Sequence, residues 1–199
     1  MSITDYTIRQ AGRPANILRS TGTIKTHMMA EATGMSAGKR RADPFTDYEH
    51  TFWLPSDTDI VTGEMIFSDG KYYLALSVET KYRFGSVEYY RGMLYECNSL
   101  ISIFSFSKIS KKHDSLVQSG VRCLLTQGRV QDVPSDGAAI SARVVPGKDT
   151  PLYVYLRNID GLEKDHIFVD GDGRRFRVSD RVDVFSAGGI SSFMVVWER

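Results

Sequence analysis

Four histidines and two cysteines are the residues of this chain best suited to catalysis or metal binding. The histidines, which lie far apart in the sequence, are His27, His50, His113 and His166. None of them has the HExxH or CxxC spacing that brings two ligands to one metal ion. Cys97 and Cys123 stand in apolar, strand-like runs, as buried free thiols do. The chain is therefore expected not to be an enzyme, and to need no metal and no other cofactor.

Two glycine-containing segments resemble ligand-binding loops. Residues 34–40 look like a phosphate-binding loop, but only three residues separate the glycines, and Arg40 stands where Ser or Thr would bind Mg²⁺. Residues 170–173 alternate Asp and Gly as a calcium loop does, but the distant bidentate Glu of such a loop is missing. Turn formation explains both segments, and we predict no phosphate or calcium site in either.

An Asp-Gly hairpin occurs twice in the chain. Ile66-Phe67-Ser68-Asp69-Gly70 is followed by Lys71-Tyr72-Tyr73-Leu74, and the Ile-Phe-x-Asp-Gly pattern returns at residues 167–171. Asp-Gly between strand-forming residues is a strong signal for a tight β-hairpin, because Gly adopts positive φ without a steric cost. The two segments therefore predict two hairpins built alike.

The features around the two hairpins also follow one order. Residues 52–54 match 154–156 upstream, residues 92–97 match 192–197 downstream, and residues 8–18 resemble 117–125. This order predicts an all-β protein with two tandem small β-barrels or β-sandwich-like units joined by a packed, strand-like connector. We expect a first unit over residues 1–98, a connector over 99–113 and a second unit over 114–199. Two unrelated hairpins in one sandwich are the alternative.

A long loop over residues 20–45 is expected in the first unit, and it concentrates the positive charge. The net charge of the chain is +1, but the stretch from Arg9 to Arg41 has seven cations and one acid, which gives +6. Long loops in small domains are usually functional or disordered. The residues expected to contact a partner or DNA are Lys25, Met28, Met29, Lys39, Arg40 and Arg41.

The expected connector alternates apolar and small polar residues, as a half-buried strand does. It could hold the two units together or offer an edge to a neighbouring subunit. The side chains considered for such a subunit contact are Ile101, Ile103, Phe104 and Phe106.

The repeated unit resembles the small β-barrels of the head-completion, or head-closure, family of tailed bacteriophages. The resemblance rests on a Gln-x-Gly strand, a long variable loop, a turn at Gly63-Glu64 or Lys164-Asp165, and the Asp-Gly hairpin that ends in Tyr73 or Phe176. It implies a virion structural protein made in the bacterial host cytoplasm, without catalytic residues. The implied role is a neck connector, a ring of roughly six or twelve subunits that contacts portal or adaptor proteins, tail proteins and packaged double-stranded DNA.

Two other functions stay open on the sequence alone. A tail-tube or tail-terminator component of the same virion would share the barrel and the ring. A tandem-barrel nucleic-acid-binding protein would use aromatic stacking platforms, for which the candidates are Tyr72, Tyr73, Phe84, Tyr89 and Tyr90. No segment approaches the ~18 apolar residues that a membrane span requires, so no membrane partner is expected.

Overall fold

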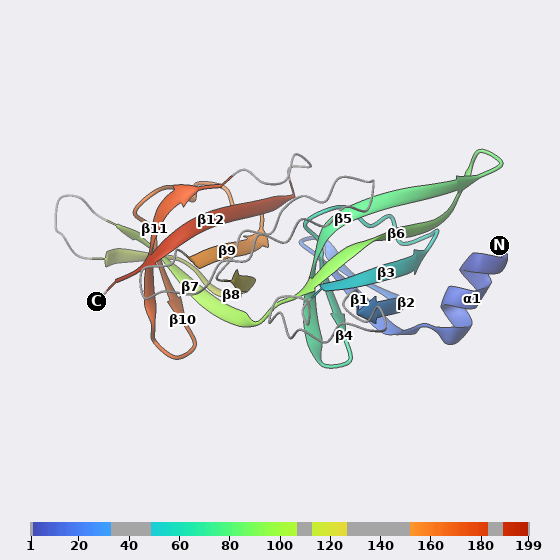
Figure 1. The fold of residues 1–199 in the computed structure, drawn as a ribbon, viewed down its shortest axis with the longest axis horizontal. Coiled ribbons are helices and arrows are strands. Elements are labelled where there is room, and N and C mark those ends of the chain that lie inside the picture. Colours follow the sequence, from blue (N-terminus) through green and yellow to red (C-terminus); the bar gives the residue numbers. More distant parts are fainter. Residues whose placement is uncertain (1, 33–48, 107–112, 127–151, 183–188, 199) are drawn as a thin grey trace, which may run out of the picture. The chain divides into compact units, whose positions relative to one another are not determined.

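The computed structural model describes residues 2–32, 49–106, 113–126, 152–182 and 189–198. The chain divides into two units, Met1–Cys97 and Asn98–Arg199, and each is described by itself. Both units are closed antiparallel β-barrels, so the predicted all-β fold with two tandem barrels is confirmed (Figure 1).

The first barrel is formed by strands β1 to β6 and carries one helix at its N-terminus. Its elements are α1 (Ile3–Ala11), β1 (Arg13–Arg19), β2 (Gly22–Ala32), β3 (Glu49–Pro55), β4 (Met65–Ser68), β5 (Lys71–Arg83) and β6 (Ser86–Glu96). Around the barrel the strands follow the order β1-β2-β3-β6-β5-β4, and β4 pairs back onto β1. The closed barrel buries one apolar core, which includes Ile17, Phe52 and Leu94.

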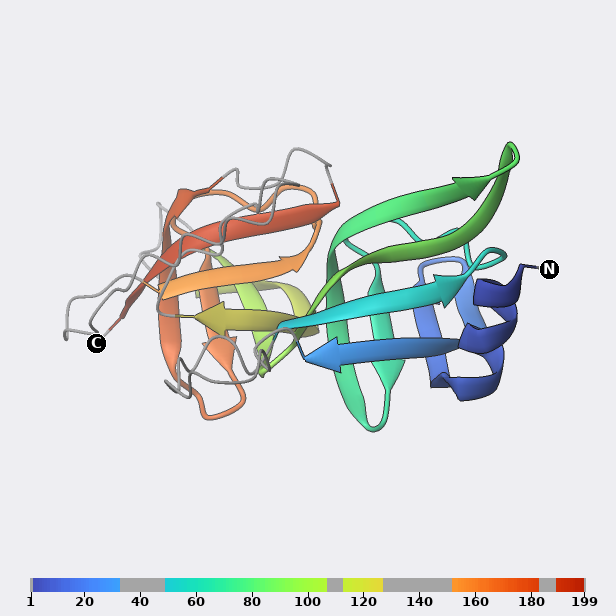
Figure 2. The same ribbon diagram turned by 45° about the vertical axis from the view of Figure 1, so that its right-hand side comes forward.

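The second barrel is formed by strands β7 to β12. Its elements are β7 (Ser99–Phe106), β8 (His113–Thr126), β9 (Leu152–Arg157), β10 (Ile167–Asp170), β11 (Arg175–Arg181) and β12 (Ile190–Trp197). Their order around the barrel is β7-β8-β9-β12-β11-β10, which repeats the order of the first barrel strand for strand. Figure 2 shows both closed barrels from a second direction. The tandem duplication inferred from the two hairpins is therefore confirmed.

The two Asp-Gly hairpins occupy equivalent places, but the structural alignment differs by one residue from the predicted one. Ile66 pairs with Tyr73 in the first barrel, and Phe168 pairs with Phe176 in the second. All four of these side chains are buried. Ile66 is thus equivalent to Phe168 and not to Ile167. The second turn has three residues between Asp170 and Arg174, whereas the first has two between Ser68 and Lys71, and this extra residue explains why a letter-by-letter match gives the wrong register.

The loop before each hairpin repeats in detail. Ala75 exchanges main-chain hydrogen bonds with Gly63 and Glu64, and Val178 exchanges the equivalent bonds with Asp165 and His166. Gly63 and Asp165 both have positive φ, at 88° and 71°. The equivalent of Gly63-Glu64 is therefore Asp165-His166, one residue later than predicted.

At one equivalent cross-strand pair, the large and the small residue stand on opposite strands in the two barrels. In the first barrel Phe52 of β3 pairs with Gly92 of β6, and in the second Val154 of β9 pairs with Phe193 of β12. Phe52 and Phe193 are fully buried, and Val154 is nearly so. Directly opposite residues on neighbouring strands share one face of the sheet. Each pair therefore supplies one phenyl ring to its core, but from opposite strands.

One predicted correspondence is wrong. Residues 8–18 form the end of α1 and most of β1, whereas residues 117–125 belong to β8, the counterpart of β2. Helix α1 has no counterpart among the described residues of the second barrel. Its nine residues bury only Asp5 and Ile8, so they carry no amphipathic pattern long enough to be recognised in the sequence.

The predicted basic loop and connector also differ from the structure. Most of the first half of the loop is strand β2, which pairs with β1 and β3. Residues 99–106 of the connector form β7, which pairs with β8 and β10 and so belongs to the second barrel. Two of its apolar residues, Ile101 and Ile103, lie in the core of that barrel. The observed boundary between the units accordingly lies between Cys97 and Asn98.

Candidate interaction surface

The described residues that were predicted to contact a partner or DNA do not share one surface. Lys25 is exposed on β2, Met29 is half-buried, and Met28 is 1% exposed in the core of the first barrel. Met28 therefore cannot contact a partner, because its side chain fills the core. Lys39, Arg40 and Arg41 lie outside the described residues, so their predicted contact with a partner or DNA stays a prediction.

The predicted subunit-contact residues on β7 are divided in the same way. Ile101 and Ile103 are 2% and 0% exposed and belong to the core of the second barrel, which removes them from any surface. Phe104 is half-buried, and the side chain of Phe106 lies outside the described residues. The prediction was wrong for Ile101 and Ile103, because β7 is a strand of the second barrel and these two side chains fill its core.

The proposed aromatic stacking platforms do not form one surface. Tyr73 and Tyr90 are both 6% exposed, and their burial raises the pKa of each phenol. Tyr72 and Tyr89 are half-buried, whereas Phe84 is 94% exposed. Of the five aromatic residues, only Phe84 presents its ring fully to solvent.

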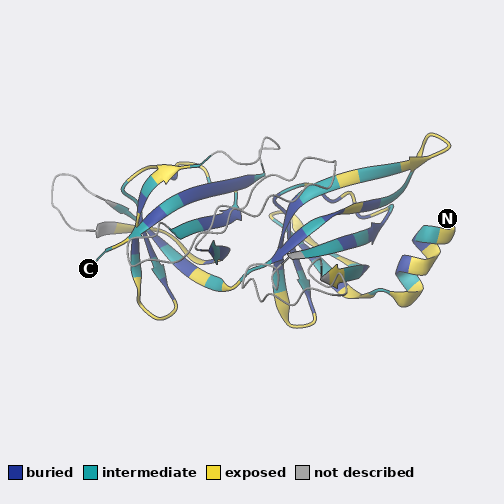
Figure 3. Cartoon of the chain, in the orientation of Figure 1, coloured by how far each residue is buried: buried dark blue, intermediate teal, exposed yellow. Residues whose placement is uncertain are grey.

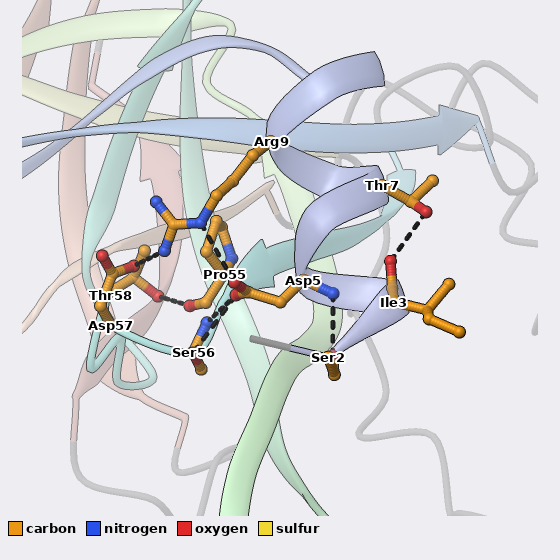
Figure 4. A network of polar contacts seen from close by, with 9 residues as sticks. All are labelled: Ser2, Ile3, Asp5, Thr7, Arg9, Pro55, Ser56, Asp57 and Thr58. Carbon is orange, nitrogen blue, oxygen red and sulfur yellow. Dashed lines mark hydrogen bonds and ion pairs between the residues drawn. The ribbon is translucent and has the colours of Figure 1, made fainter.

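Helix α1 is held on the first barrel by a polar clamp around Asp5 (Figure 4). Asp5 Oδ1 accepts hydrogen bonds from the backbone N–H and the hydroxyl of Ser56, at 2.9 and 3.2 Å. Arg9 Nε donates to Asp5 Oδ2 at 3.1 Å, and Arg9 Nη2 lies 2.8 Å from Asp57 Oδ1. The Ser2 hydroxyl caps the helix by accepting from the Asp5 N–H. These contacts fix α1 to the loop that follows β3.

The clamp sets the charge of Asp5. Burial disfavours its ionised form, but hydrogen bonds from Ser56 and Arg9 outweigh that effect, and the pKa of Asp5 lies below its ordinary value. The pKa of Arg9 is raised by its hydrogen bonds to Asp57 and Asp5. Both side chains are therefore charged at neutral pH, as a structural ion pair requires.

A second ion pair stabilises the same loop, which connects β3 to β4. Arg19 of β1 pairs through Nε and Nη2 with Glu64, whose side chain is 7% exposed. Glu64 Oε2 also accepts from the Val61 N–H at 3.0 Å. In the second barrel His166 Nδ1 takes the equivalent place, 3.2 Å from the Glu163 nitrogen. This repetition shows that Glu64 stabilises a loop that both barrels share.

Beyond the end of β3, strands β5 and β6 continue as a two-stranded ribbon, here called the arm (residues 82–88). Figures 1 and 2 show its tip at the same end of the barrel as α1. β5 pairs with β4 only over Lys71–Leu74, and from Ser77 to Arg83 its sole partner among the described strands is β6. The outer edge of the arm therefore presents main-chain groups along the length of the ribbon.

The tip of the arm is apolar and conformationally strained. Phe84 and Gly85 form the two-residue turn, with φ of 50° and 78°. Type I′ turns need positive φ at both positions and favour Asn-Gly, so a bulky aromatic residue is unusual in the first position. Phe84 is 94% and Tyr82 68% exposed, and the tip stands out as exposed in Figure 3. The Arg83 guanidinium lies over Phe84, 5.4 Å from its ring centroid.

The same end of the barrel gathers further exposed apolar side chains. Ile3 and Tyr6 of α1 are 80% and 57% exposed. Thr4 of α1 donates to Glu88 at the base of the arm at 3.4 Å, and Glu88 also pairs with Arg83 at 3.5 Å. The helix and the base of the arm are thus linked through Thr4 and Glu88.

In the second barrel the first half of β8 forms an exposed edge beside β7, which pairs with β10 on its other side, and register shifts interrupt the β7–β8 ladder. From Ser115 to Gly120 every residue of β8 is exposed, including Leu116 and Val117 at 54% and 44%. β8 pairs with β9 only from Cys123 onward, so β7 is the sole described partner of Ser115–Gly120. This edge of β8 is called the β8 edge below.

These surfaces can bind through main-chain hydrogen bonds and apolar contacts. Among the described residues no group of three or more His, Cys, Asp or Glu side chains is arranged to hold a metal ion. Over the same residues, no helix is long and apolar enough to cross a membrane. Cys123 is buried, as predicted, whereas Cys97 is half-buried.

Comparisons with known proteins give little help. No protein family matches the chain, and no curated protein does. Among solved structures, apo MrkH from K. pneumonia is 8% identical, with a TM-score of 0.21 over 98% of this chain and 82% of that one. The MrkH–c-di-GMP complex is 9% identical, with a TM-score of 0.19 over 99% and 87%. TM-scores this low carry no argument about the function of this chain.

Proposed function

We propose that the chain is a non-enzymatic structural protein of a tailed-phage virion, a head-completion or neck connector that assembles into a ring of roughly six or twelve subunits. The observation that carries the proposal is the repeated barrel. Both copies contain the Asp-Gly hairpin of that family, preceded by a turn with positive φ at Gly63 or Asp165. A rigid barrel that is used twice suits a scaffold that holds neighbouring proteins in register.

The surface of the first barrel supports the same role. An arm with an exposed aromatic tip, braced through Glu88 to a clamped helix, is rigid at its base and apolar at its end. Protein interfaces are anchored by such aromatic side chains, because they bury a large area with little loss of side-chain entropy. Portal, adaptor and tail proteins are the partners proposed for this surface.

The basic segment is proposed to contact packaged DNA or an acidic partner through Lys39, Arg40 and Arg41. Phosphate contacts of this kind are independent of sequence and sensitive to salt. Changing all three residues to Ala should leave the free energy of unfolding within about 0.5 kcal/mol, and it should reduce the yield of DNA-filled particles. Lys164→Ala combined with Arg177→Ala, two exposed cations of the second barrel, serves as the control.

The decisive experiment is cryo-electron microscopy of particles that contain the protein. Ring density between portal and tail would support the proposal, whereas density along or at the end of the tail tube would favour a tail component. A normal yield of DNA-filled particles from the triple variant would remove the role given to the basic segment.

A titration of the purified chain with single-stranded DNA tests the nucleic-acid-binding alternative. Saturable binding would favour a nucleic-acid-binding protein over a structural one. A steep dependence of DNA binding on salt would identify phosphate contacts as its source.

A further inference from the structure

The two barrels are joined without a separate linker. Cys97 and Asn98 are the only two residues between β6 and β7. The Cys97 N–H donates to the Tyr72 carbonyl at 2.7 Å, which continues the β5–β6 ladder of the first barrel. Asn98 bonds through its side chain to Leu125 of β8, in the second barrel. These two consecutive residues are thus fixed to different barrels.

The side chain of Asn98 takes the place of a main-chain group. Ser99 pairs with Cys123, so a longer β7 would bring Cys97 opposite Leu125. The N–H of Cys97 is instead used by the first barrel. The Leu125 N–H donates to Asn98 Oδ1 at 2.8 Å, and Asn98 Nδ2 donates to the Leu125 carbonyl at 2.9 Å. A side-chain amide can replace a peptide group in this way because it carries both a donor and an acceptor.

The equivalent place in the first barrel is filled in a related way. Ala30 of β2 corresponds to Leu125 of β8, because their partners, Phe52 and Val154, occupy equivalent positions. The Ala30 carbonyl accepts from Arg13 Nη2 at 3.4 Å, where the chain passes from α1 into β1. In both barrels a side chain therefore donates to the carbonyl just beyond the last pair of the first strand. The contact at Leu125 is bidentate, since its N–H is bonded as well.

We propose that Asn98 is a positioning residue, which limits how far the second barrel can rotate about its connection to the first. Each residue contributes two soft backbone torsions, φ and ψ. The N–H of Cys97 is held by the first barrel, and the side chain of Asn98 is held by β8. The bonds to Leu125 therefore remove ψ of Asn98 as a free rotation, and φ of Asn98 and the torsions of Cys97 remain. Without these bonds the start of β7 would fray, as weakly bonded strand ends do.

Residual dipolar couplings of the backbone amides measure this restriction directly. They are collected for the purified full-length chain in a dilute alignment medium, and each barrel is fitted separately. The wild-type barrels should share one degree of alignment. In Asn98→Ala, which changes an exposed residue, the two degrees of alignment should diverge because the barrels then reorient independently. Unequal alignment in the wild-type chain, or equal alignment in Asn98→Ala, would overturn the proposal.

Amide hydrogen exchange at Leu125 tests the bonds that Asn98 makes. In Asn98→Ala the exchange should be faster by about tenfold, since the Leu125 N–H loses its acceptor. Asn98→Asp keeps that acceptor and lacks the Nδ2 donor, so the N–H should stay protected. Asn16→Ala, which removes a half-buried amide from β1, is the matched control and should change neither measurement. Unchanged exchange in Asn98→Ala, or equally fast exchange in Asn98→Asp, would contradict these bonds and with them the proposal.

The role of Asn98 goes beyond the connector role and does not depend on it. Restricted rotation would lower the conformational entropy that a two-barrel scaffold loses when its partners bind. Both measurements use the purified chain, so the absence of a ring from virions would leave the result at Asn98 standing. Conversely, ring density between portal and tail, together with independent alignment of the wild-type barrels, would support the connector and overturn the role of Asn98.

Discussion

Gly92 of β6 is a position where one added methyl group should damage the first barrel. A Cβ atom built on Gly92 would lie 1.9 Å from the carbonyl oxygen of Ser77 and 2.8 Å from its carbonyl carbon. It would also lie 2.8 Å from Cε1 of Phe52. Real Cβ atoms essentially never come closer than 3.0 Å to a heavy atom. Gly92→Ala therefore requires movement of the β5 backbone and not only of a flexible side chain.

The size of the effect follows from that backbone contact. Overpacking of a core typically costs about 1 to 3 kcal/mol and occasionally more. Because the closest atom belongs to the main chain of a paired strand, we expect a loss of at least ~3 kcal/mol in the free energy of unfolding. For a unit of this size, each kcal/mol lowers the melting temperature by roughly 4 to 8 °C. A decrease of more than about 10 °C in the first barrel should result.

The two tryptophans allow each barrel to be followed separately. Trp53 lies on β3 of the first barrel and Trp197 on β12 of the second. In a Trp197→Phe background, fluorescence during a urea titration reports the first barrel, and Trp53→Phe gives the converse reporter. Gly92→Ala should move the transition seen by Trp53 and leave that seen by Trp197 in place.

Gly171→Ala is the matched control. A Cβ atom at Gly171 would have no heavy atom within 4 Å, and this glycine is not among those with positive φ. Its substitution should change the free energy of unfolding by less than about 0.5 kcal/mol. If Gly92→Ala were as mild as Gly171→Ala, the close packing of β5 against β6 at this position would be refuted.

Three other predictions concern stability. Phe168→Ala should cost ~3 to 5 kcal/mol, because the ring is 0% exposed in the second core, and a loss below about 1 kcal/mol in urea would place it outside a core. Phe84→Asn should raise the melting temperature of the first barrel, since it relieves up to roughly 1 to 2 kcal/mol of turn strain; a lower melting temperature would contradict the strain. The pKa of Asp5 is lowered from 3.8 in the folded chain, so its carboxylate stabilises the fold above that value, and the contribution is lost as the pH falls through the lowered pKa. Asp5→Asn should therefore show a weaker loss of stability on acidification than the wild type in calorimetry, and an equal loss would show that Asp5 is not the group responsible.

The sequence predicted the barrels because their hairpins are signalled locally. Asp69-Gly70 and Asp170-Gly171 mark the turns, and alternating apolar residues mark the strands around them. The one-residue difference in register was not visible, because it depends on which side chains face the core after the longer second turn. Helix α1 was missed since it is fixed by the clamp around Asp5, a long-range polar contact without periodicity.

The candidate surface was only partly predictable. β2 was assigned to a loop because Gly22, Thr23, Lys25 and His27 are exposed and polar, and Met28 is one of few residues that reach the core. Phe84-Gly85 could have been recognised as a hairpin turn with a bulky first residue. The β8 edge could not be recognised from the sequence. An edge is exposed where no neighbouring strand pairs with it, and no local sequence pattern shows which strands will pair.

The exchange of large and small residues between the two cores also has a consequence for folding. Tandem copies of one fold can misfold by pairing a strand of one copy with a strand of the other. If β3 paired with β12, Phe52 would face Phe193 and two phenyl rings would compete for the space of one. If β9 paired with β6, Val154 would face Gly92 and leave a void. The reciprocal sizes in the pairs Phe52–Gly92 and Val154–Phe193 thus disfavour these mixed pairings while the chain folds.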